Sequence, residues 1–514
     1  MNINLCQFIF SIAFLNLLFT SCTKAPTNFS EIEDYISISP EYSNITIPPN
    51  ISAMNFLVND SADKYFFKIW ADNGNTICRK NKTGKLELSN KQWKKLVAKS
   101  NKIYTDIFLN KNNIWYKSKT IENCIVLDSI DTYLTYRYFL PSFQVVKGIG
   151  IYRRNLVNFK SRPLVKTEYE NLCFNCHVYA ANDSRTAMFH VRESKIGGTI
   201  ILNDDSIYKI KPKVASMLNN ATYPAWHPSG KYIAFSANKV DQLFYASKLR
   251  RDAYDVSSNL VIYDVDNNKM ISDSTISGHD YLETYPCWDA SGQYLYFCRT
   301  NYNFHDSAKT IFDAVKYRNV LYDLMRLKFE PEKKHLGEPE YVLHAGEIGK
   351  SIVTPRISPD GKYLLFCALD YGNFPLFHKE SDFWVLNLQN GNCRKLANIN
   401  SPYAEGYHCW SKNSRWIVYS SRALDGVHSS IWIAYFDENG KAHKPFILPQ
   451  KDPAYYQSFV KSFTFPELTI NDANINMRKL YRVVNSSEQI LPEAVGYLSG
   501  STNVNGISGA TLIQ

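Results

Sequence analysis

Four segments of this chain repeat one pattern, and this repetition limits the possible folds more than any other feature of the sequence. Each segment has a short aromatic stretch, a turn rich in Pro, Ser, Asp, Asn or Gly, and a run of alternating aromatic and aliphatic residues. That order is typical of a β-hairpin. A third strand-like run with its own turn follows each hairpin. The segments are YPAWHPSGKYIAFSAN (223–238), YPCWDASGQYLYFCRT (285–300), TPRISPDGKYLLFCAL (354–369) and YHCWSKNSRWIVYSSR (407–422).

The spacing of these repeats indicates a β-propeller. Their starts lie 62, 69 and 53 residues apart, whereas a compact blade has about 40 to 50 residues, so insertions are present. Short antiparallel sheets repeated in this way must stack, because no single blade buries both of its faces. Weaker copies lie at 178–192 and, as two strands of a degenerate blade, at 131–140 and 149–160. The sequence therefore predicts an all-β chain with a six-bladed β-propeller.

The composition of the rest of the chain indicates further segments before and after the propeller. An Asn-Gly turn between two strand-like runs near residue 74 indicates a small β domain before the propeller. Polar segments flank the two domains, and the last of them is rich in Gly and Ser, which favours loose order. We expect a signal peptide at 1–22, a tether at 23–44, a small basic β domain at 45–120, the propeller at 125–470 and a polar tail at 471–514.

The N-terminus is predicted to direct export. The apolar run FIFSIAFLNLLF (8–19) is shorter than the roughly 20 residues that span a bilayer. The ending FTSC resembles a bacterial lipobox, in which the signal is cut before Cys22 and lipid is added to that residue. Phe19 where Leu is usual, and the absence of Lys and Arg before the apolar run, depart from that pattern. A plain secretory signal is therefore the alternative.

The positive charge of the chain is local. The formal net charge is +10, and residues 63–120 hold 14 Lys or Arg against 4 Asp or Glu. This excess is consistent with a surface that faces anionic lipid head groups or an acidic partner. A solvated face rich in Lys and Asn explains the excess as well and is the preferred interpretation. Nucleic acid is not an expected partner of an exported chain.

One short motif carries chemistry. Cys173, Cys176 and His177 in NLCFNCHVYAAND (171–183) form the C-x-x-C-H signature of covalent haem c attachment. The two thiols add to the haem vinyl groups, and the histidine becomes an axial iron ligand. Strand order places this motif in the loop that enters the second blade, beside the channel mouth. The long insertions of the later blades are expected to rise on the same face.

Three other interpretations of the motif compete with haem. A zinc site needs a second Cys/His pair, and none with matching spacing is visible. A redox dithiol would be expected in a thioredoxin-like βαβ context, which is absent. A structural disulfide is the third. For a sixth iron ligand the candidates are His305, His378 and His408.

His190 is a weaker sixth-ligand candidate. It lies almost opposite His177 across the predicted hairpin, where paired residues are only about 5 Å apart. Two residues that close cannot bind both faces of a haem. Two axial ligands would favour electron transfer, whereas an open position would allow ligand binding or peroxide chemistry.

The repeats resemble the TolB-like β-propeller family, whose recurring unit is W-S-P-D-G-K-x-I-A-F. SPDGKYLLF (358–366) is the nearest copy, and the resemblance extends over roughly 125–450. Together with the lipobox, TIPPN (46–50), the C-x-x-C-H motif and QKDPAYYQSF (450–459), the chain resembles a group of Bacteroidetes-type propeller lipoproteins. That resemblance implies an outer-membrane location. No acidic cluster follows Cys22, which favours the periplasmic side.

Two functional hypotheses follow, and both favour an electron carrier or a binding protein over an enzyme. The first is a lipid-anchored propeller with one haem c that exchanges electrons with a redox or envelope protein docked on the haem-bearing face. The second is a non-catalytic TolB-like propeller that binds a peptide, glycan or protein and has a structural Cys pair. A serine peptidase is excluded, because no G-x-S-x-G occurs. A glycosidase or lyase would have to use carboxylates such as Glu283, Glu405 and Asp382.

Overall fold

The chain divides into two compact units, described here separately. The smaller comprises 1–127 and 449–458, and the larger 128–448 and 459–514. Across the described part of the chain, no helix is both long and apolar enough to cross a membrane. The computed structural model describes residues 24–139, 150–166, 173–192, 195–204, 206–214, 217, 219–243, 252–278, 280–301, 317–472 and 475–496.

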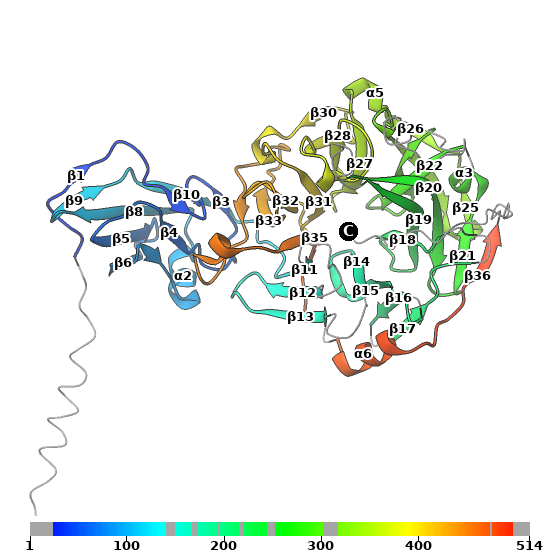
Figure 1. Ribbon diagram of the computed structural model, residues 1–514, viewed down its shortest axis with the longest axis horizontal. Helices are drawn as coiled ribbons and strands as arrows, with labels where there is room; N and C mark the ends of the chain where they lie inside the picture. Colours follow the sequence, from blue (N-terminus) through cyan, green and yellow to red (C-terminus); the bar gives the residue numbers. More distant parts are fainter. Residues whose placement is uncertain are drawn as a thin grey trace, which may run out of the picture. The chain divides into compact units, whose positions relative to one another are not determined.

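The described residues of the larger unit form six sheets around a common centre (Figure 1). From the inner strand outward, the first three are β35 (Ser462–Thr469), β11 (Tyr133–Phe139), β12 (Gly150–Asn155) and β13 (Ser161–Lys166); β14 (Cys173–Ala180), β15 (Asp183–Arg192), β16 (Gly198–Asn203) and β17 (Ser206–Ile210); and β18 (Thr222–Trp226), β19 (Tyr232–Leu243), β20 (Asp252–Asp264) and β21 (Lys269–Ser272).

The other three sheets follow the same order. They are β22 (Leu282–Trp288), β23 (Tyr294–Thr300) and β24 (Asp323–Glu330) with β25 (His335–Leu336) and β26 (Glu340–Leu343); β27 (Ser351–Ile357), β28 (Tyr363–Leu369), β29 (Asp382–Asn387) and β30 (Cys393–Lys395); and β31 (Glu405–Trp410), β32 (Trp416–Ser421), β33 (Ser430–Tyr435) and β34 (Phe446–Ile447). Short helices join some strands: α3 (Ser274–Ser277), η2 (Pro331–Lys333), α5 (Ala345–Ile348), η3 (Pro375–Phe377) and η4 (Ala397–Ile399).

These sheets confirm the predicted all-β, six-bladed propeller. Each inner strand contacts the inner strand of the next sheet, and β35 contacts β14 to complete the ring. The first blade joins the two ends of the chain, because β35 comes from the C-terminal part and pairs with β11 from the N-terminal part. Apolar clusters fill the space between blades; one of them includes Ile262 of β20 with Leu295 and Leu327 of the next blade.

A tight turn joins the two innermost strands of each repeat. Gly230, Gly292 and Gly361 occupy the same place in three of these turns with φ of 72°, 76° and 72°. Glycine adopts this left-handed backbone without the steric cost that a side chain brings. In the sixth blade Ser414 takes this position, with φ 62°. The turn residues of the repeat are thus explained by backbone geometry.

Two of the predicted segments are more ordered than expected. The tail contains α6 (Met477–Asn485), whose Leu480 and Val484 are buried in the core of the second blade, and β36 (Glu493–Gly496), which pairs in parallel with β21. The i, i+4 spacing of the two buried side chains gives this polar segment one apolar stripe. Residues 497–514 lie outside the described part.

The smaller unit also includes the predicted tether. A seven-stranded sheet packs against helix α2 and a three-stranded sheet, and Ile36, Ile38 and Tyr42 from the tether are buried in this unit. The elements are β1 (Ser30–Glu31), β2 (Ile38–Ser39), β3 (Thr46–Ile47), β4 (Phe56–Val58), β5 (Lys64–Ala71), β6 (Thr76–Asn81), β7 (Lys85–Leu86), α2 (Asn90–Val97), β8 (Lys102–Lys111), β9 (Ile114–Lys117), β10 (Ile121–Ile125) and η5 (Tyr455–Ser458).

Candidate functional site

Each inner strand of the propeller has a bulge at the same place. In β18, for example, Tyr223 and Pro224 stand opposite a single residue of β19. Bulges re-aim side chains and are frequent beside functional sites. In five of the six inner strands the first residue of the bulge has left-handed backbone, with φ of 44° to 52° at Tyr223, Tyr285, Thr354, Tyr407 and Phe465. Each such non-glycine residue costs on the order of 1–3 kcal/mol, so the rest of the blade must hold it in place.

The C-x-x-C-H motif lies at this bulge in the second blade. Phe174 pairs with Val191 and His177 pairs with Phe189, so residues 175 and 176 form the bulge. Cys176 therefore occupies the place of Pro224, and His177 that of Ala225. This corrects the predicted position of the motif: it belongs to the inner strand β14 itself, and not to the loop before it. FNCHV lacks the Tyr-Pro-x-Trp pattern that marks the inner strands at 223–226 and 285–288, so the sequence alone does not show that the motif belongs to the strand.

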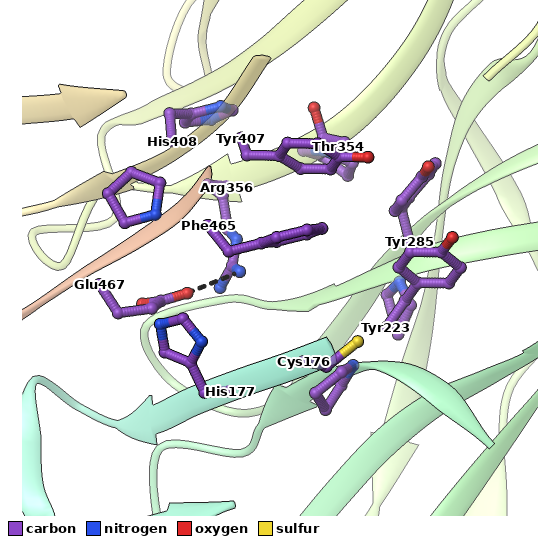
Figure 2. Close-up of a pocket in the computed structure, with 14 residues that line it drawn as sticks. Cys176, His177, Tyr223, Tyr285, Thr354, Arg356, Tyr407, His408, Phe465 and Glu467 are labelled. Atoms are coloured by element: carbon purple, nitrogen blue, oxygen red, sulfur yellow. Dashed lines mark hydrogen bonds and ion pairs between the residues drawn. The ribbon is translucent and has the colours of Figure 1, made fainter. Parts of the chain in front are cut away.

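Cys176 and His177 line a cavity in the channel of the propeller (Figure 2). Its volume is about 50 Å³, which is room for a few water molecules. The wall is built from the bulges of all six inner strands. The lining residues are Cys176, His177, Tyr223, Pro224, Tyr285, Pro286, Thr354, Pro355, Arg356, Tyr407, His408, Phe465, Pro466 and Glu467.

The imidazole of His177 is buried and held neutral. Its residue is 3% exposed, and burial is the largest cause that lowers its pKa to about 4. The backbones of Thr135 and Phe465 oppose this shift, and the charges of Arg137 and Arg356 add to it. Neither ring nitrogen makes a hydrogen bond of acceptable geometry within the described residues. Buried polar atoms are nearly always paired, so the unmatched ring nitrogens of His177 at the channel wall make this residue a candidate ligand for a bound group.

An ion pair crosses the channel beside His177. Arg356 Nη2 of β27 lies 3.0 Å from Glu467 Oε1 of β35, with the side chains 34% and 11% exposed. In the view of Figure 2 this pair lies between His177 and His408. Burial raises the pKa of Glu467, and the charge of Arg356 opposes that shift. Arg356 is thus a fixed positive charge beside both histidines.

A second cavity begins on the other side of this ion pair. Its volume is about 200 Å³, and Arg356 and Glu467 line it as well as the first. Trp226, Trp288 and Trp410, one from each of three inner strands, form part of its wall. The channel of the propeller therefore has two chambers that meet at the Arg356–Glu467 pair.

His408 is the predicted sixth-ligand candidate that shares the cavity with His177. Its Nε2 lies 3.1 Å from the carbonyl oxygen of Leu365, and its Nδ1 has no hydrogen-bond partner among the described residues. Burial and then the charge of Arg356 lower its pKa to about 3. His190 stands opposite the bulge of β14, is absent from the cavity lining, and contacts Thr199 Oγ1 at 3.1 Å. Burial lowers the pKa of His190 to about 3.

The other two sixth-ligand candidates are not brought to the cavity. His378 is engaged by two carboxylates: its Nε2 lies 3.3 Å from Asp252 Oδ1 and its Nδ1 lies 3.1 Å from Glu380 Oε1. Burial alone would lower its pKa, but these two carboxylates outweigh it and raise the pKa to about 9. A charged imidazole with both nitrogens engaged is unsuited to bind iron, which corrects the expectation for His378. His305, Cys22 and the side chain of Cys173 lie outside what the structure describes.

The three predicted channel carboxylates belong to structural networks. Glu283 accepts from Arg299 Nε at 2.8 Å, Glu405 accepts from Ser421 Oγ at 2.9 Å, and Asp382 accepts from Lys395 Nζ at 2.5 Å. Burial raises the pKa of Glu283 to about 7 and that of Glu405 to about 8. None of the three lines either cavity. They give no support to a glycosidase or lyase site.

Sequence reasoning missed Arg356 and Glu467. Each directly follows a Thr-Pro or Phe-Pro dipeptide at the bulge of its strand, at the place of Ala225. Aligning the X-Pro dipeptides of the four inner strands that have one would have marked this position as channel-facing. Within the described residues, no group of three or more His, Cys, Asp or Glu side chains could hold a metal ion.

No family model matches this chain, and no curated protein matches it. Solved structures do. An oligogalacturonate lyase in complex with manganese has 13% identity and a TM-score of 0.36, covering 62% of this chain and 74% of that one. An oligogalacturonate lyase from Vibrio parahaemolyticus has 12% identity and a TM-score of 0.33, covering 60% and 92%. A prolyl endopeptidase has 10% identity and a TM-score of 0.32, covering 63% and 51%.

Proposed function

We propose that this chain is an outer-membrane lipoprotein whose propeller carries one covalent haem c and exchanges electrons with a docked protein. Cys173, Cys176 and His177 would hold the haem, and Cys22 the lipid. The observation that supports this most is the buried, neutral imidazole of His177, whose ring nitrogens make no hydrogen bond among the described residues. Neutral imidazole is the form that binds metal. The anchor and the periplasmic location are part of the proposal.

The residues of the motif match haem c in their chemistry, because they offer two thiols and one neutral imidazole close together in the chain. Cys176 lines the same cavity as His177, and Cys173 opens the same strand. The cavity volume of about 50 Å³ is far below that of a porphyrin, so side chains around it must move when haem is attached. When bound, the haem supplies one-electron transfer. The chain supplies two thiols for thioether bonds and an imidazole that burial, Arg137 and Arg356 keep neutral.

A second candidate function is ligand binding in the channel without haem. The small cavity and its aromatic wall, with Tyr223, Tyr285, Tyr407 and Phe465, favour this function, and so does the resemblance of the repeats to TolB-like propellers. The Cys pair would then remain as thiols. A strand places Cα atoms three residues apart at roughly 9–10 Å, whereas a disulfide needs less than about 7 Å.

The experiment that tests the haem proposal is an imidazole rescue. The His177→Gly variant keeps both cysteines, so haem stays covalently bound but loses its protein ligand, and its visible spectrum shifts. Added imidazole should restore the wild-type spectrum. The matched control is Cys409→Ala, which changes the equivalent position of the sixth blade and should leave the spectrum unchanged.

Two results would contradict the proposal. One is wild-type protein without a haem spectrum, purified from cells that mature other c-type cytochromes. The other is a His177→Gly spectrum identical to that of wild type. The first result would leave the binding function, and ligand screening of the channel would follow.

A further inference from the structure

One face of the seven-stranded sheet in the smaller unit combines lysines with aromatic rings. The cross-strand register puts Trp70 beside Tyr104, and Phe66 beside both Lys80 and Phe108. Phe108 in turn pairs with Lys117. Residues paired across strands point to the same side of a sheet. We call this the lysine–aromatic face, defined by Lys68, Trp70, Lys80, Tyr104, Trp115 and Lys117.

Side-chain contacts confirm that these residues share one surface. The rings of Trp70 and Tyr104 stack with their centroids 5.4 Å apart and 18° between planes. Lys68 Nζ lies 4.7 Å from the Trp70 ring, and Lys80 Nζ lies 5.9 Å from the Trp115 ring. Trp70, Tyr104 and Trp115 are only half-buried. Lysines and amphipathic aromatic rings together are the composition of surfaces that meet lipid head groups.

The opposite face of this sheet is the core of the unit. Phe67 and Ile69 of β5 and Ile107 of β8 are buried there. Helix α2 packs on β5 and β8 and buries Trp93, Leu96 and Val97. Three acidic groups lie on the lysine–aromatic face: Asp106 is 3.5 Å from Lys117, Glu122 is 2.5 Å from Lys102, and the exposed Glu31 pairs with Lys117 across β1 and β9. They are fewer than the lysines of the same face, which include Lys68 and Lys80. One face of the sheet is therefore apolar and buried, and the lysine–aromatic face has more positive than negative charges.

The N-terminal segment reaches the unit at this same face. The Phe29 ring packs edge-on against Phe108 at 5.4 Å, and Lys117 Nζ lies 5.9 Å from the Phe29 ring. Phe29 is the seventh residue after Cys22, so the face lies within about 25 Å of the anchored residue even when the segment is fully extended. A lipid on Cys22 would hold this face close to the bilayer.

We propose that the lysine–aromatic face rests on the anionic surface of the membrane that holds the lipid of Cys22. This inference rests on the proposed lipid anchor but not on the haem. The lysines pair with phosphate head groups and the half-buried rings lie at the head-group level. The lipid would hold the chain at the membrane, and a basic patch beside it would orient the smaller unit on the bilayer surface.

The test uses the full mature chain with Cys22→Ser, exported without lipid, and co-sedimentation with two kinds of vesicle. Vesicles of phosphatidylcholine with phosphatidylglycerol should bind the protein, and binding should fall as salt rises. Vesicles of phosphatidylcholine alone should bind it far less. The Lys68→Glu, Lys80→Glu double variant should weaken binding roughly thirty-fold or more, at about five-fold per lysine lost.

Lys94→Glu, Lys95→Glu is the matched control, because these exposed lysines lie on α2, over the other face. It makes the same charge change and should weaken binding only slightly. Equal weakening by both double variants would overturn the proposal, as would no binding to anionic vesicles at low salt. In the latter case an acidic protein would be the partner to seek. Haem content is read independently on the same samples, so the two proposals can fail separately.

Discussion

The inner strands β14 and β22 have the same bulge but present different groups to the channel. In β22 the bulge is Tyr285-Pro286, and the next residue is Cys287, a buried thiol. In β14 the places of Pro286 and Cys287 are taken by Cys176 and His177. The comparison teaches that one bulge position can present very different side chains to the channel. Pro286 occupies the second place of the bulge in β22, whereas in β14 that place and the next hold Cys176 and His177, which line the channel cavity.

The neighbouring tryptophans show the same difference. Trp288 Nε1 donates to the carbonyl oxygen of Ala225 at 3.1 Å, and Trp410 Nε1 donates to that of Arg356 at 3.0 Å. Each acceptor is the channel-facing residue of the preceding blade. The equivalent acceptor for Trp226 is His177, yet Trp226 Nε1 has no partner among the described residues. Unpaired buried polar groups thus gather around the motif.

The largest expected effect is acid destabilisation. The folded pKa values of His190 and His408 are about 3, below the usual 6.5. The unfolded chain therefore binds protons first, so stability is lost as pH falls below 6.5, by up to about 1.4 kcal/mol per pH unit for each histidine. His378 affects stability in the opposite direction, because its folded pKa of about 9 lies above the usual 6.5. Its contribution to the unfolding free energy is fully present below pH 6.5 and is lost as pH rises to 9.

Urea unfolding across pH measures both effects in a haem-free Cys173→Ser, Cys176→Ser background. His408→Gln should flatten the acid side of the stability profile, and His378→Gln should flatten the alkaline side. An acid side unchanged by His408→Gln would contradict a neutral imidazole in the channel wall.

The next effect concerns the ion pair between the two chambers. Arg356→Met leaves the Glu467 carboxylate largely buried without its partner, which should cost roughly 3 kcal/mol near pH 8. The cost should shrink at lower pH, because burial raises the pKa of Glu467. Adding Glu467→Leu should recover most of the loss. A double variant as unstable as the sum of the two single variants would show that the pair does not act as a unit.

The smallest expected effect is a difference in stability between two tryptophan variants, one in β22 and one in β18, which follows β14 in the ring. Trp288→Phe leaves the carbonyl of Ala225 without its donor, which should cost about 1–3 kcal/mol beyond the lost packing. Trp226→Phe removes an N–H that makes no hydrogen bond, so it should lose only the packing. The difference in urea unfolding free energy between the two variants is the measurement. Equal costs would mean that the second blade is built like the others.

The sequence was sufficient for the propeller but not for all of its strands. Four blades could be predicted because aromatic-aliphatic alternation and Gly or Ser turns act locally. The inner strand of the first blade, SFTFPELT (462–469), lacks that hairpin, and its partner β11 lies more than 300 residues earlier. Local patterns do not encode such a pairing. The order of helix α6 depends likewise on distant contacts, because Leu480 and Val484 are buried against residues of the second blade.

The site was predictable only in part. The motif residues stand out by their spacing, and two of them, Cys176 and His177, do line the channel. Arg356 and Glu467 come from blades five and one and are 111 residues apart, so their pairing arises only from ring closure. His378 was chosen as a ligand candidate, but Asp252 and Glu380, which come from two different insertions, engage it instead.

The most direct test of the haem assignment is the intact mass of the mature protein after denaturation, purified from an envelope fraction. The account predicts the mass of the chain plus one haem, with the gain abolished in the Cys173→Ala, Cys176→Ala variant and kept in the Cys287→Ala control. A wild-type mass without haem, from cells that mature other c-type cytochromes, would contradict the account. The bulge of β14 would then line a ligand-binding channel that carries no haem.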